Sequence, residues 1–388
     1  MRVLFVCPFV PWPRENGGKI RTGALLEAAS KRVEIDLCVI DDGTQREDAL
    51  EALGAHVHDV DWFPRGRASL TKRLFRAKLE RWFHSPELAA RLARVRPGDY
   101  DLVHLDEMLL VRTMPRVKDT PVVVHHHKLD RILYEKLSRG EGPKRHWDLT
   151  KLAHLERVSV ARFPDQIFCS AEDAETYSRS HPTVRPHVLP SGFEPARFER
   201  APFETRDARR LLFLGSMDYG PNVEGARWFV SQVLPKIEER VGPIVLELVG
   251  ANPVAEVRAL ESARVLVTGR VPDVRPHLAR TGAMLVPLSI GGGTRLKIVE
   301  ALAMETPTVS TRIGAEGLGL VDGEHLALAD SPDEFARATA ELLLDGKKAR
   351  QLAECGANHV RKQFPWQRLG DRLAEIWSEI KASSTTHP

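Results

Sequence analysis

Short, unbroken apolar runs recur along the chain between longer segments of helical periodicity, and this alternation is the strongest constraint on the fold. Runs such as 3–7 (VLFVC) and 121–125 (PVVVH) lack the polar alternation of a strand with one solvated face. Strands that are apolar on both faces are typical of parallel sheets covered by helices on each side. We therefore predict an α/β fold. The predicted strands are 3–7, 34–40, 56–60, 101–105, 121–125, 166–170, 210–215, 245–250, 264–269, 283–288, 306–311 and 325–330.

The alternation occurs twice, with a pause at 181–210, where five prolines interrupt any periodicity. A chain of 388 residues also favours two domains. We predict two Rossmann-like domains that face each other across a cleft, since open parallel sheets bind ligands beyond the carboxyl ends of their strands. The predicted divisions are an N-terminal domain at 1–190, a Pro-rich linker at 191–206, a C-terminal domain at 207–364, and a last segment at 365–388 whose amphipathic helix packs back on the N-terminal domain before a disordered tail.

Composition narrows the class of protein further. Apolar residues make up 43% of the chain, charged residues make up 28%, and the net charge is only +3, so the sequence is typical of a soluble globular protein. The four cysteines form no C-x-x-C pair, which argues against a zinc ribbon, a thioredoxin-type site or a disulfide framework. Prolines break the apolar N-terminal run, and no apolar run approaches 18 residues. We expect a cytoplasmic protein.

The segment IGGGTRLKIVEALAM at 290–304 leaves a predicted strand and opens a helix predicted over 294–304. The first amides of a helix lack internal partners and lie at the positive end of its dipole, so they suit a phosphate or diphosphate. Cations there are mildly unfavourable unless an anion binds, although a solvated basic turn is the alternative interpretation. Glu300, about one turn on, is placed to accept hydrogen bonds from ribose. The candidate diphosphate- and sugar-binding residues are Gly291, Gly292, Gly293, Thr294, Arg295 and Lys297.

The second half resembles the retaining, two-domain (GT-B) glycosyltransferases of family 4, over 211–237 and 267–318. The N-terminal glycine pair Gly17–Gly18 and the segment VLPSGFE at 188–194 extend the resemblance to nearly the whole chain. It implies a nucleotide-sugar donor bound mainly by the C-terminal domain and an acceptor bound by the N-terminal domain. The glycine pair would then close against the diphosphate and the acceptor.

Several residues take roles from this resemblance. Glu300 matches the second Glu of the family's E-x7-E signature, which holds the ribose hydroxyls. Gly269, Arg270 and Val271 match the loop whose backbone reads the base.

The sequence also departs from the family pattern. The first Glu of E-x7-E falls at Gly292, and the usual Arg and Lys after the strand ending in FLG fall at Ser216 and Asn222. We hypothesise that Arg295 and Lys297 supply the missing positive charge.

Three adjacent histidines follow a predicted strand in HHHKLD at 125–130. Successive strand residues point to opposite faces, so at most two of the three could share a metal ion, and no Cys or Asp cluster nearby in sequence completes a set. We therefore predict no metal site. The resemblance places one histidine beside the reacting carbon of the donor sugar; His127 takes that place, with His126 or His125 as alternatives if the strand is shorter. A histidine packed at a domain face is the structural interpretation.

No pair of carboxylates stands out as a general acid and a nucleophile, which is what glycoside hydrolysis requires. Asp106, Glu107 and Asp130 are the nearest acidic residues, and we interpret each as structural or solvated. A reaction without catalytic carboxylates agrees with the front-face mechanism that the resemblance implies. In that mechanism the leaving diphosphate takes the proton of the acceptor hydroxyl.

A basic stretch at 64–96 holds ten Lys or Arg against two Glu, with apolar residues at near-helical spacing over 70–83. A helix that packs on the core is the favoured interpretation. Contact with an anionic membrane that carries a lipid-linked acceptor is the alternative, and it would place the protein at the inner face of the membrane. Nucleic acid is disfavoured because no base-stacking or groove-reading module accompanies the charge.

Taken together, the sequence predicts a retaining glycosyltransferase that needs no cofactor. It would use a UDP- or GDP-linked sugar and an acceptor hydroxyl on a lipid-linked glycan or a small molecule. A non-catalytic nucleotide-sugar-binding paralogue and a GT-B-shaped sugar-nucleotide epimerase are the rival functions. A nicotinamide-dependent oxidoreductase is disfavoured because no G-x-G-x-x-G follows the first strand.

Overall fold

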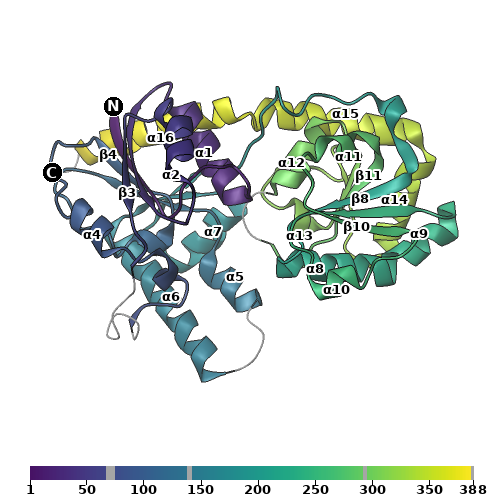
Figure 1. Ribbon diagram of the computed structural model, residues 1–388, viewed down its shortest axis with the longest axis horizontal. Helices are drawn as coiled ribbons and strands as arrows, with labels where there is room; N and C mark the ends of the chain where they lie inside the picture. The colour runs from purple at the N-terminus through teal and green to yellow at the C-terminus, as the bar shows by residue number, and fades with distance from the viewer. Residues whose placement is uncertain (67–74, 138–141, 292–294, 386–388) are drawn as a thin grey trace. The chain divides into compact units, whose positions relative to one another are not determined.

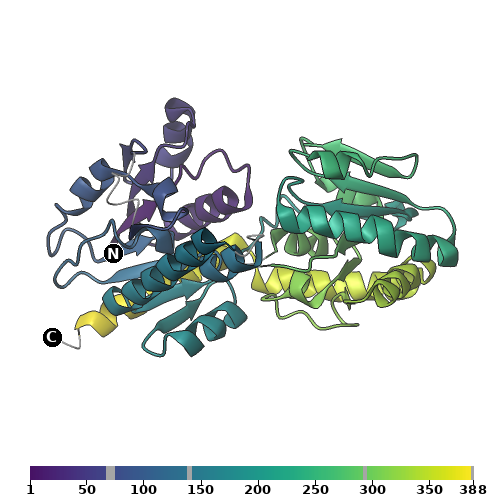
Figure 2. The same ribbon diagram turned by 90° about the horizontal axis from the view of Figure 1, so that it is seen from below.

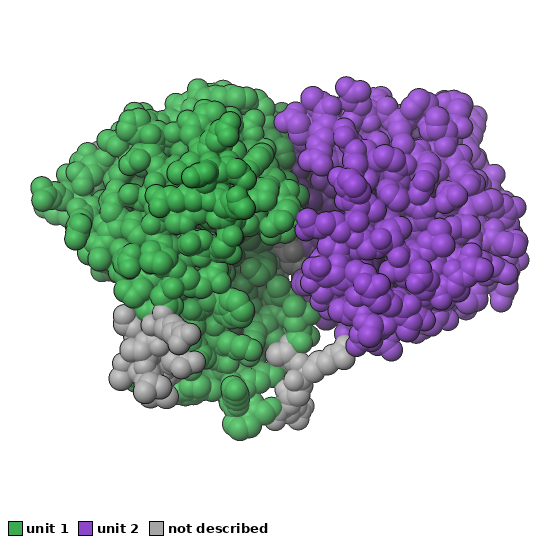
Figure 3. Space-filling view, in the orientation of Figure 1, with its two compact units in different colours: residues 1–191, 366–388 green, residues 192–365 purple. Residues whose placement is uncertain are grey.

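The computed structural model describes residues 1–66, 75–137, 142–291 and 295–385. The chain divides into two compact units, which are coloured separately in Figure 3. Unit 1 comprises Met1–Ser191 and Trp366–Pro388, and unit 2 comprises Gly192–Pro365. The terminal segment thus returns to the unit in which the chain begins.

Unit 1 is built on a parallel seven-stranded sheet of order β3-β2-β1-β4-β5-β6-β7 (Figure 1). Its strands are β1 (Arg2–Cys7), β2 (Glu34–Ile40), β3 (Asp59–Phe63), β4 (Leu102–Leu105), β5 (Val122–His126), β6 (Asp165–Phe168) and β7 (Arg185–Val188). Its helices are α1 (Gly17–Ala29), α2 (Arg46–Gly54), α4 (Pro86–Leu92), α5 (Asp130–Leu137), α6 (Pro143–Arg162), α7 (Ala171–Ser180) and α16 (Trp366–Thr385), with 3-10 turns η1 (Glu80–Phe83) and η2 (Met108–Leu110).

Unit 2 has a parallel six-stranded sheet of order β10-β9-β8-β11-β12-β13, the same winding as unit 1. Its strands are β8 (Asp207–Leu214), β9 (Val245–Val249), β10 (Val265–Gly269), β11 (Thr281–Val286), β12 (Thr308–Ser310) and β13 (Ala327–Leu328). Its helical segments are η3 (Phe203–Thr205), α8 (Gly220–Trp228), η4 (Phe229–Val233), α9 (Leu234–Val241), α10 (Ala255–Arg258), α11 (Arg275–Arg280), α12 (Leu296–Ala303), α13 (Arg312–Ala315), α14 (Pro332–Leu344) and α15 (Gly346–Gln363). Two buried apolar clusters pack on its sheet.

The predicted fold class, two Rossmann-like α/β domains with parallel sheets, is confirmed. Each predicted strand overlaps an observed one, but β7 was not predicted. Its sequence RPHV contains a proline and is largely exposed, which is typical of an edge strand and leaves no apolar run to detect. Residues 192–206, nearly all of the predicted linker, belong to unit 2, where Phe193, Phe198 and Ala201 are buried in one of its apolar clusters.

The basic stretch at 64–96 does not contain the continuous helix predicted over 70–83 in its described part. Residues 67–74 lie outside the described residues, and 80–83 form the 3-10 turn η1. A buried carboxylate fixes this turn: Glu80 accepts a hydrogen bond from Arg112 at 3.0 Å and pairs with Arg76 at 3.4 Å. Within the described ranges, no helix combines the length and the apolar character needed to cross a bilayer.

Helix α16 completes the core of unit 1, against which Figures 1 and 2 show it lying. Its apolar stripe, at helical spacing, is buried: Leu369, Leu373, Ile376, Trp377 and Ile380. The helix approaches α1 so closely that a Cβ added at Gly370 would lie 2.3 Å from the Cβ of Ala28. Within this stripe, the Trp377 indole donates a hydrogen bond of 3.0 Å to Nδ1 of His104 on β4.

We predict that Trp377→Ala destabilises unit 1 by about 3–5 kcal/mol, the range for truncating a fully buried aromatic side chain. Trp82→Ala is the matched control, because that indole is 58% exposed and its removal should cost less than about 0.5 kcal/mol. Urea unfolding followed by far-UV circular dichroism measures both free energies. Equal costs for the two variants would contradict the packing of α16 into the core.

Candidate functional site

The strand order of unit 2 reverses between β8 and β11, and ligands of open parallel sheets bind at the carboxyl ends of strands beside such a reversal. Two glycines there allow close packing. A Cβ added at Gly250, after β9, would lie 1.7 Å from the carbonyl oxygen of Gly215, after β8. A Cβ added at Gly225, on α8, would lie 2.6 Å from the carbonyl oxygen of Pro287, after β11. The side chains of α12 reach the same edge.

Lys297, in the first turn of α12, points to the end of β8. Its Nζ donates hydrogen bonds to the carbonyl oxygen of Leu214 at 2.6 Å and to Oδ1 of Asn222 at 3.0 Å. The amide of Asn222 in turn donates to the carbonyl oxygen of Ser216 at 2.9 Å. Burial, together with the positive charge of Arg295, lowers the pKa of Lys297 to about 7. The amino group of Lys297 thus contacts Asn222 directly and is connected to Ser216 through Asn222.

Arg295 is buried and precedes the first residue of α12. Its guanidinium folds over Gly291, where an added Cβ would lie 1.5 Å from Nη2, and Nη2 donates to the carbonyl oxygen of Ile313 at 3.3 Å. Only a glycine at 291 leaves room for this arrangement. The helix predicted over 294–304 is observed as Leu296–Ala303. Three of the candidate residues lie outside the described residues: Gly292, Gly293 and Thr294.

Glu300 lies half-buried one turn after Lys297. Burial raises the pKa of Glu300 to about 7, although the positive charge of Arg197 acts in the opposite direction. Within the described part of the chain, no hydrogen bond or ion pair holds this carboxylate. The group is therefore available to a ligand that donates hydrogen bonds.

The predicted base-reading loop follows β10 at the same edge of unit 2. Gly269 has a positive φ of 71°, and its carbonyl oxygen accepts a hydrogen bond of 3.1 Å from the amide of Gly250. Arg270 is exposed, whereas Val271 packs against the apolar cluster that includes Ile298 and Val299 of α12. The loop and the helix therefore share one packed region.

In unit 1 the corresponding reversal lies between β1 and β4. Gly17 and Gly18 are the first two residues of α1, two positions earlier than the predicted helix start near Lys19. Asn16 caps this helix, its side chain accepting a hydrogen bond of 3.1 Å from the amide of Lys19. Both glycines thus lie at a helix N-terminus beside the reversal, where backbone amides are available.

The three histidines at the end of β5 lie on both faces of the sheet, because successive side chains of a strand point to opposite faces. His126 is buried, lies 2.6 Å from Oε1 of Gln166 through Nε2, and stacks on Phe168 with ring centroids 4.8 Å apart. Burial lowers the pKa of His126 to about 4 despite that contact. His127 lies on the other face and its side chain is 11% exposed. The structure therefore separates His126 from His127 and disfavours the catalytic assignment of His126, because its ring is enclosed in the core.

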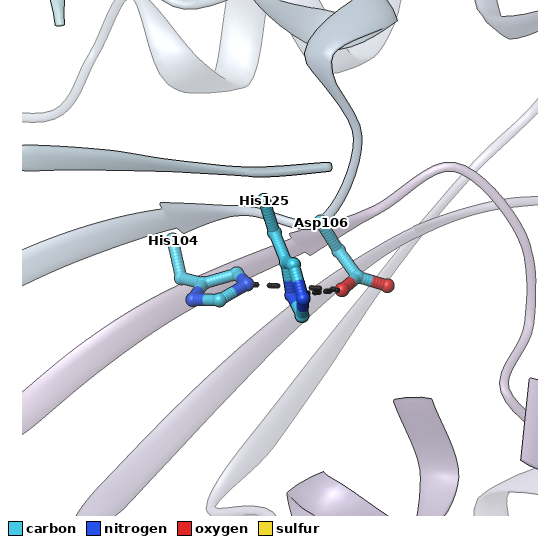
Figure 4. A group of neighbouring side chains, drawn as sticks. All are labelled: His104, Asp106 and His125. Atoms are coloured by element: carbon cyan, nitrogen blue, oxygen red, sulfur yellow. Dashed lines mark ion pairs between the residues drawn. The ribbon is translucent and has the colours of Figure 1, made fainter. Parts of the chain in front are cut away.

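His125 and His127 share their face with His104 of β4 and with Asp106, which directly follows that strand. Figure 4 shows the rings of His104 and His125 beside the Asp106 carboxylate. Oδ1 of Asp106 lies 3.1 Å from Nε2 of His127, 3.4 Å from Nδ1 of His125 and 3.7 Å from Nε2 of His104. These are close charge contacts and not hydrogen bonds, because none of the four buried atoms has a hydrogen-bond partner among the described residues. Burial acts to raise the pKa of Asp106, but the histidines outweigh it and hold the pKa well below its ordinary value.

Ligand atoms of His104, Asp106 and His125 lie within 4.8 Å of one another, which is close enough for the three side chains to share a metal ion. A metal would need lone pairs on Nδ1 of His125 and Nε2 of His104. However, Arg21 lies 2.9 Å from Nε2 of His125, and the Trp377 indole donates to Nδ1 of His104. Both partners are donors only, so the nitrogens that face Asp106 carry the protons. The donor set does not fit a metal ion, and the absence of a metal stays a prediction.

Sequence reasoning missed the roles of Arg21 and Asp106. Arg21 is buried in α1 and donates from Nη1 to Oγ of Ser191 at 2.7 Å. A signal for Asp106 was present, because the run ending in HLDE places His104 and Asp106 two residues apart at the end of the strand beside β5. Assigning strand neighbours before choosing candidates would have brought them together.

Comparison with known proteins agrees with this architecture. Residues 208–345 match the family described as Glycosyl transferases group 1. The GDP-mannose-dependent alpha-(1-6)-phosphatidylinositol monomannoside mannosyltransferase of Mycolicibacterium smegmatis is 26% identical over 163 residues, which are 38% of this chain and 43% of that protein. The phosphatidyl-myo-inositol mannosyltransferase of Mycobacterium leprae is 24% identical over 78% of this chain and 79% of its own length. The Anabaena protein HepE, solved with UDP and glucose, superposes with a TM-score of 0.70 at 15% identity, over 98% of this chain and 100% of that one.

The pKa of Glu300 predicts a pH-dependent effect of Glu300→Gln on stability. The unfolded chain ionises this residue near its ordinary pKa of 4.5, whereas the folded chain keeps the proton until about pH 7. The wild-type protein therefore loses stability through this group as the pH rises from about 4.5 to 7. Relative to wild type, Glu300→Gln should gain about 1–3 kcal/mol between pH 5 and pH 8. Urea unfolding of both proteins at pH 5, 6, 7 and 8 measures the gain, and a constant difference would contradict it.

Proposed function

We propose that the chain is a glycosyltransferase that moves a hexose from a nucleoside diphosphate sugar to an acceptor hydroxyl with retention of configuration, because residues 208–345 match a group 1 glycosyltransferase domain and the fold is GT-B. The observation that carries the proposal is the position of Lys297. Its ammonium group lies at the β8–β11 reversal of unit 2, where a diphosphate is expected to bind.

In this proposal Lys297 and Arg295 replace the cations that the family pattern would place at Ser216 and Asn222. The contacts of Lys297 with Leu214 and Asn222 put one positive charge beside these neutral positions. A diphosphate would stabilise the charged form of Lys297, whose pKa is low without it. The segment 291–294 is proposed to provide backbone amides to the diphosphate, and the role of Gly17–Gly18 stays a prediction.

Glu300 is proposed to hold the ribose hydroxyls, and the backbone of Gly269, Arg270 and Val271 is proposed to read the base. The Glu300 carboxylate supports this role because it is half-buried and forms no hydrogen bond or ion pair among the described residues. Hydroxyl donors would stabilise its charged form and bring its pKa down from about 7.

The proposed reaction breaks the bond between the sugar's anomeric carbon and the diphosphate oxygen, and forms a bond from the same face to the acceptor oxygen. The acceptor's proton passes to the leaving diphosphate, so no separate base and no cofactor are required. His127 is the proposed histidine beside the donor sugar, where it would hydrogen-bond a sugar hydroxyl.

The donor is proposed to be UDP- or GDP-linked, since HepE was solved with UDP and the mycobacterial relative depends on GDP-mannose. The acceptor is a lipid-linked glycan or a small molecule in a cytoplasmic reaction, and a lipid-linked acceptor would bring the protein to the inner face of the membrane. Phe75 and Trp82, within 64–96, are exposed and would meet that surface.

A thermal-shift panel of UDP, GDP, dTDP, ADP and CMP tests the donor site. One nucleoside diphosphate at about 100 times its Kd should stabilise the wild-type protein by about 2.7 kcal/mol. Glu300→Ala should lose most of that effect, whereas Glu256→Ala, which removes an exposed carboxylate of α10, should keep it. Failure of all five nucleotides to stabilise the wild type would favour the non-catalytic paralogue, which the neutral Ser216 and Asn222 support.

Comparison of Arg295→Ala with Arg270→Ala separates the proposed diphosphate cation from the proposed base-reading loop. Loss of a charged hydrogen-bond donor should weaken nucleoside diphosphate binding on the order of 10- to 100-fold for Arg295→Ala. Arg270→Ala should change the affinity less than about threefold, because only the backbone of that loop is assigned a contact. Isothermal titration calorimetry measures both, and equal losses would refute the role of Arg295.

A further inference from the structure

We propose that Asp106 is a positioning residue that holds the proton of His127 on Nε2, so that Nδ1 is the nitrogen presented to the substrate. The inference rests on the proposed function only for its effect on the rate of sugar transfer. The arrangement of Asp106 and the three histidines does not depend on that function. The arrangement follows from the partners of the two other histidines that face Asp106.

His104 and His125 have fixed tautomers. Arg21 donates to Nε2 of His125 at 2.9 Å, and the Trp377 indole donates to Nδ1 of His104 at 3.0 Å. Because neither partner can accept a hydrogen bond, each ring must carry its proton on the nitrogen that faces Asp106. Two N–H groups are thereby directed at Oδ1 of Asp106 from the interior of unit 1.

The Asp106 carboxylate is fixed on its other side as well. Oδ2 accepts a hydrogen bond of 2.7 Å from Oγ1 of Thr22 on α1 and lies 3.6 Å from Sγ of Cys7 at the end of β1. With Oδ2 occupied, Oδ1 remains directed at the histidines. The carboxylate is fully buried, so solvent does not compete for it.

His127 is the ring through which this cluster reaches the surface. Its Nε2 lies 3.1 Å from Oδ1 of Asp106, the shortest of the three histidine distances, and its side chain is 11% exposed while the other two rings are enclosed. The negative charge of the carboxylate at this distance favours a proton on Nε2 over a lone pair. In the neutral ring Nδ1 then has a lone pair, which accepts a hydrogen bond from a hydroxyl group. Nε2 of His127 is buried and forms no hydrogen bond among the described residues, so Asp106 acts on it through its charge at 3.1 Å.

Asp106 affects sugar transfer only through the orientation of the His127 ring. The proton on Nε2 stays with His127 throughout, and the acceptor's proton still passes to the leaving diphosphate. Asp106 sets which nitrogen faces the sugar and the orientation of the ring, and it does so through His127 without touching the substrate.

Nuclear magnetic resonance of 15N-histidine-labelled protein tests the tautomer directly. At pH 8.5, above the ordinary imidazole pKa of about 6.5, long-range 1H–15N spectra distinguish a protonated from an unprotonated ring nitrogen. The His127→Gln spectrum assigns the resonances of His127 by difference. In the wild type we expect a protonated Nε2 and an unprotonated Nδ1, and in Asp106→Asn we expect a mixture of tautomers.

Glu107→Gln is the matched control, because it removes the next, equally buried carboxylate, which pairs instead with Lys128 at 3.2 Å. Its His127 resonances should match those of the wild type. A wild-type His127 protonated on Nδ1 would overturn the proposal, as would an unchanged tautomer in Asp106→Asn. The wild-type spectrum alone decides the assignment if Asp106→Asn is too unstable to label. Stoichiometric zinc in the purified protein, lost on His127→Gln, would also overturn it.

Steady-state kinetics separates positioning from a purely structural role. For Asp106→Asn we expect kcat to fall about 100-fold, the loss that a small misplacement of a positioned group can cause, with the KM for the donor within about twofold of wild type. A raised donor KM at unchanged kcat would contradict positioning. Absence of transfer by the wild type with every donor would refute the proposed function, while the tautomer measurement would still decide the hydrogen-bond arrangement.

Discussion

A parallel sheet whose strand order reverses leaves an open edge between two strands, because the crossover connections on either side turn away from it. Both units of this chain are wound in this manner, and Asp106 and Lys297 each lie beside one of the two reversals. In unit 1 the reversal collects Asp106, its histidines and Thr22; in unit 2 it collects Lys297. The chemistry of the protein is therefore placed by topology first and by residue choice second.

Residue choice at the unit 2 reversal shows how a binding charge can move within a fold. The segment after β8 carries Ser216 and Asn222, which are neutral, yet the side chain of Lys297 reaches Asn222 from α12. Asn222 connects the two segments, accepting from Lys297 and donating to the carbonyl oxygen of Ser216. A lysine on a helix can place its charge near the position that a cation of the loop after β8 would occupy. The sequence motif then differs from the family pattern, while a positive charge remains close to the end of β8.

Sequence reasoning was sufficient where a feature is local. Buried strands of a parallel sheet are nearly all apolar, so each of them except the polar edge strand β7 was detectable, and the glycine-rich approach to α12 was visible as a motif. It was insufficient where a feature depends on which strands are neighbours. The grouping of Asp106 with His127 requires that β4 lies beside β5, and the tautomers of the histidines require Arg21 from α1 and Trp377 from α16.

The return of α16 to unit 1 also determines the order in which the protein can be completed during synthesis. Unit 2 is one continuous segment and has all its residues once the ribosome has passed Pro365. Unit 1 begins first but lacks the Trp377 side chain, which packs beside His104 from 273 positions further along the chain. Its apolar surface for α16 must therefore stay uncovered while the whole of unit 2 is made, a period in which nascent chains are most exposed to aggregation and to chaperones. A helix made after unit 2 therefore completes unit 1.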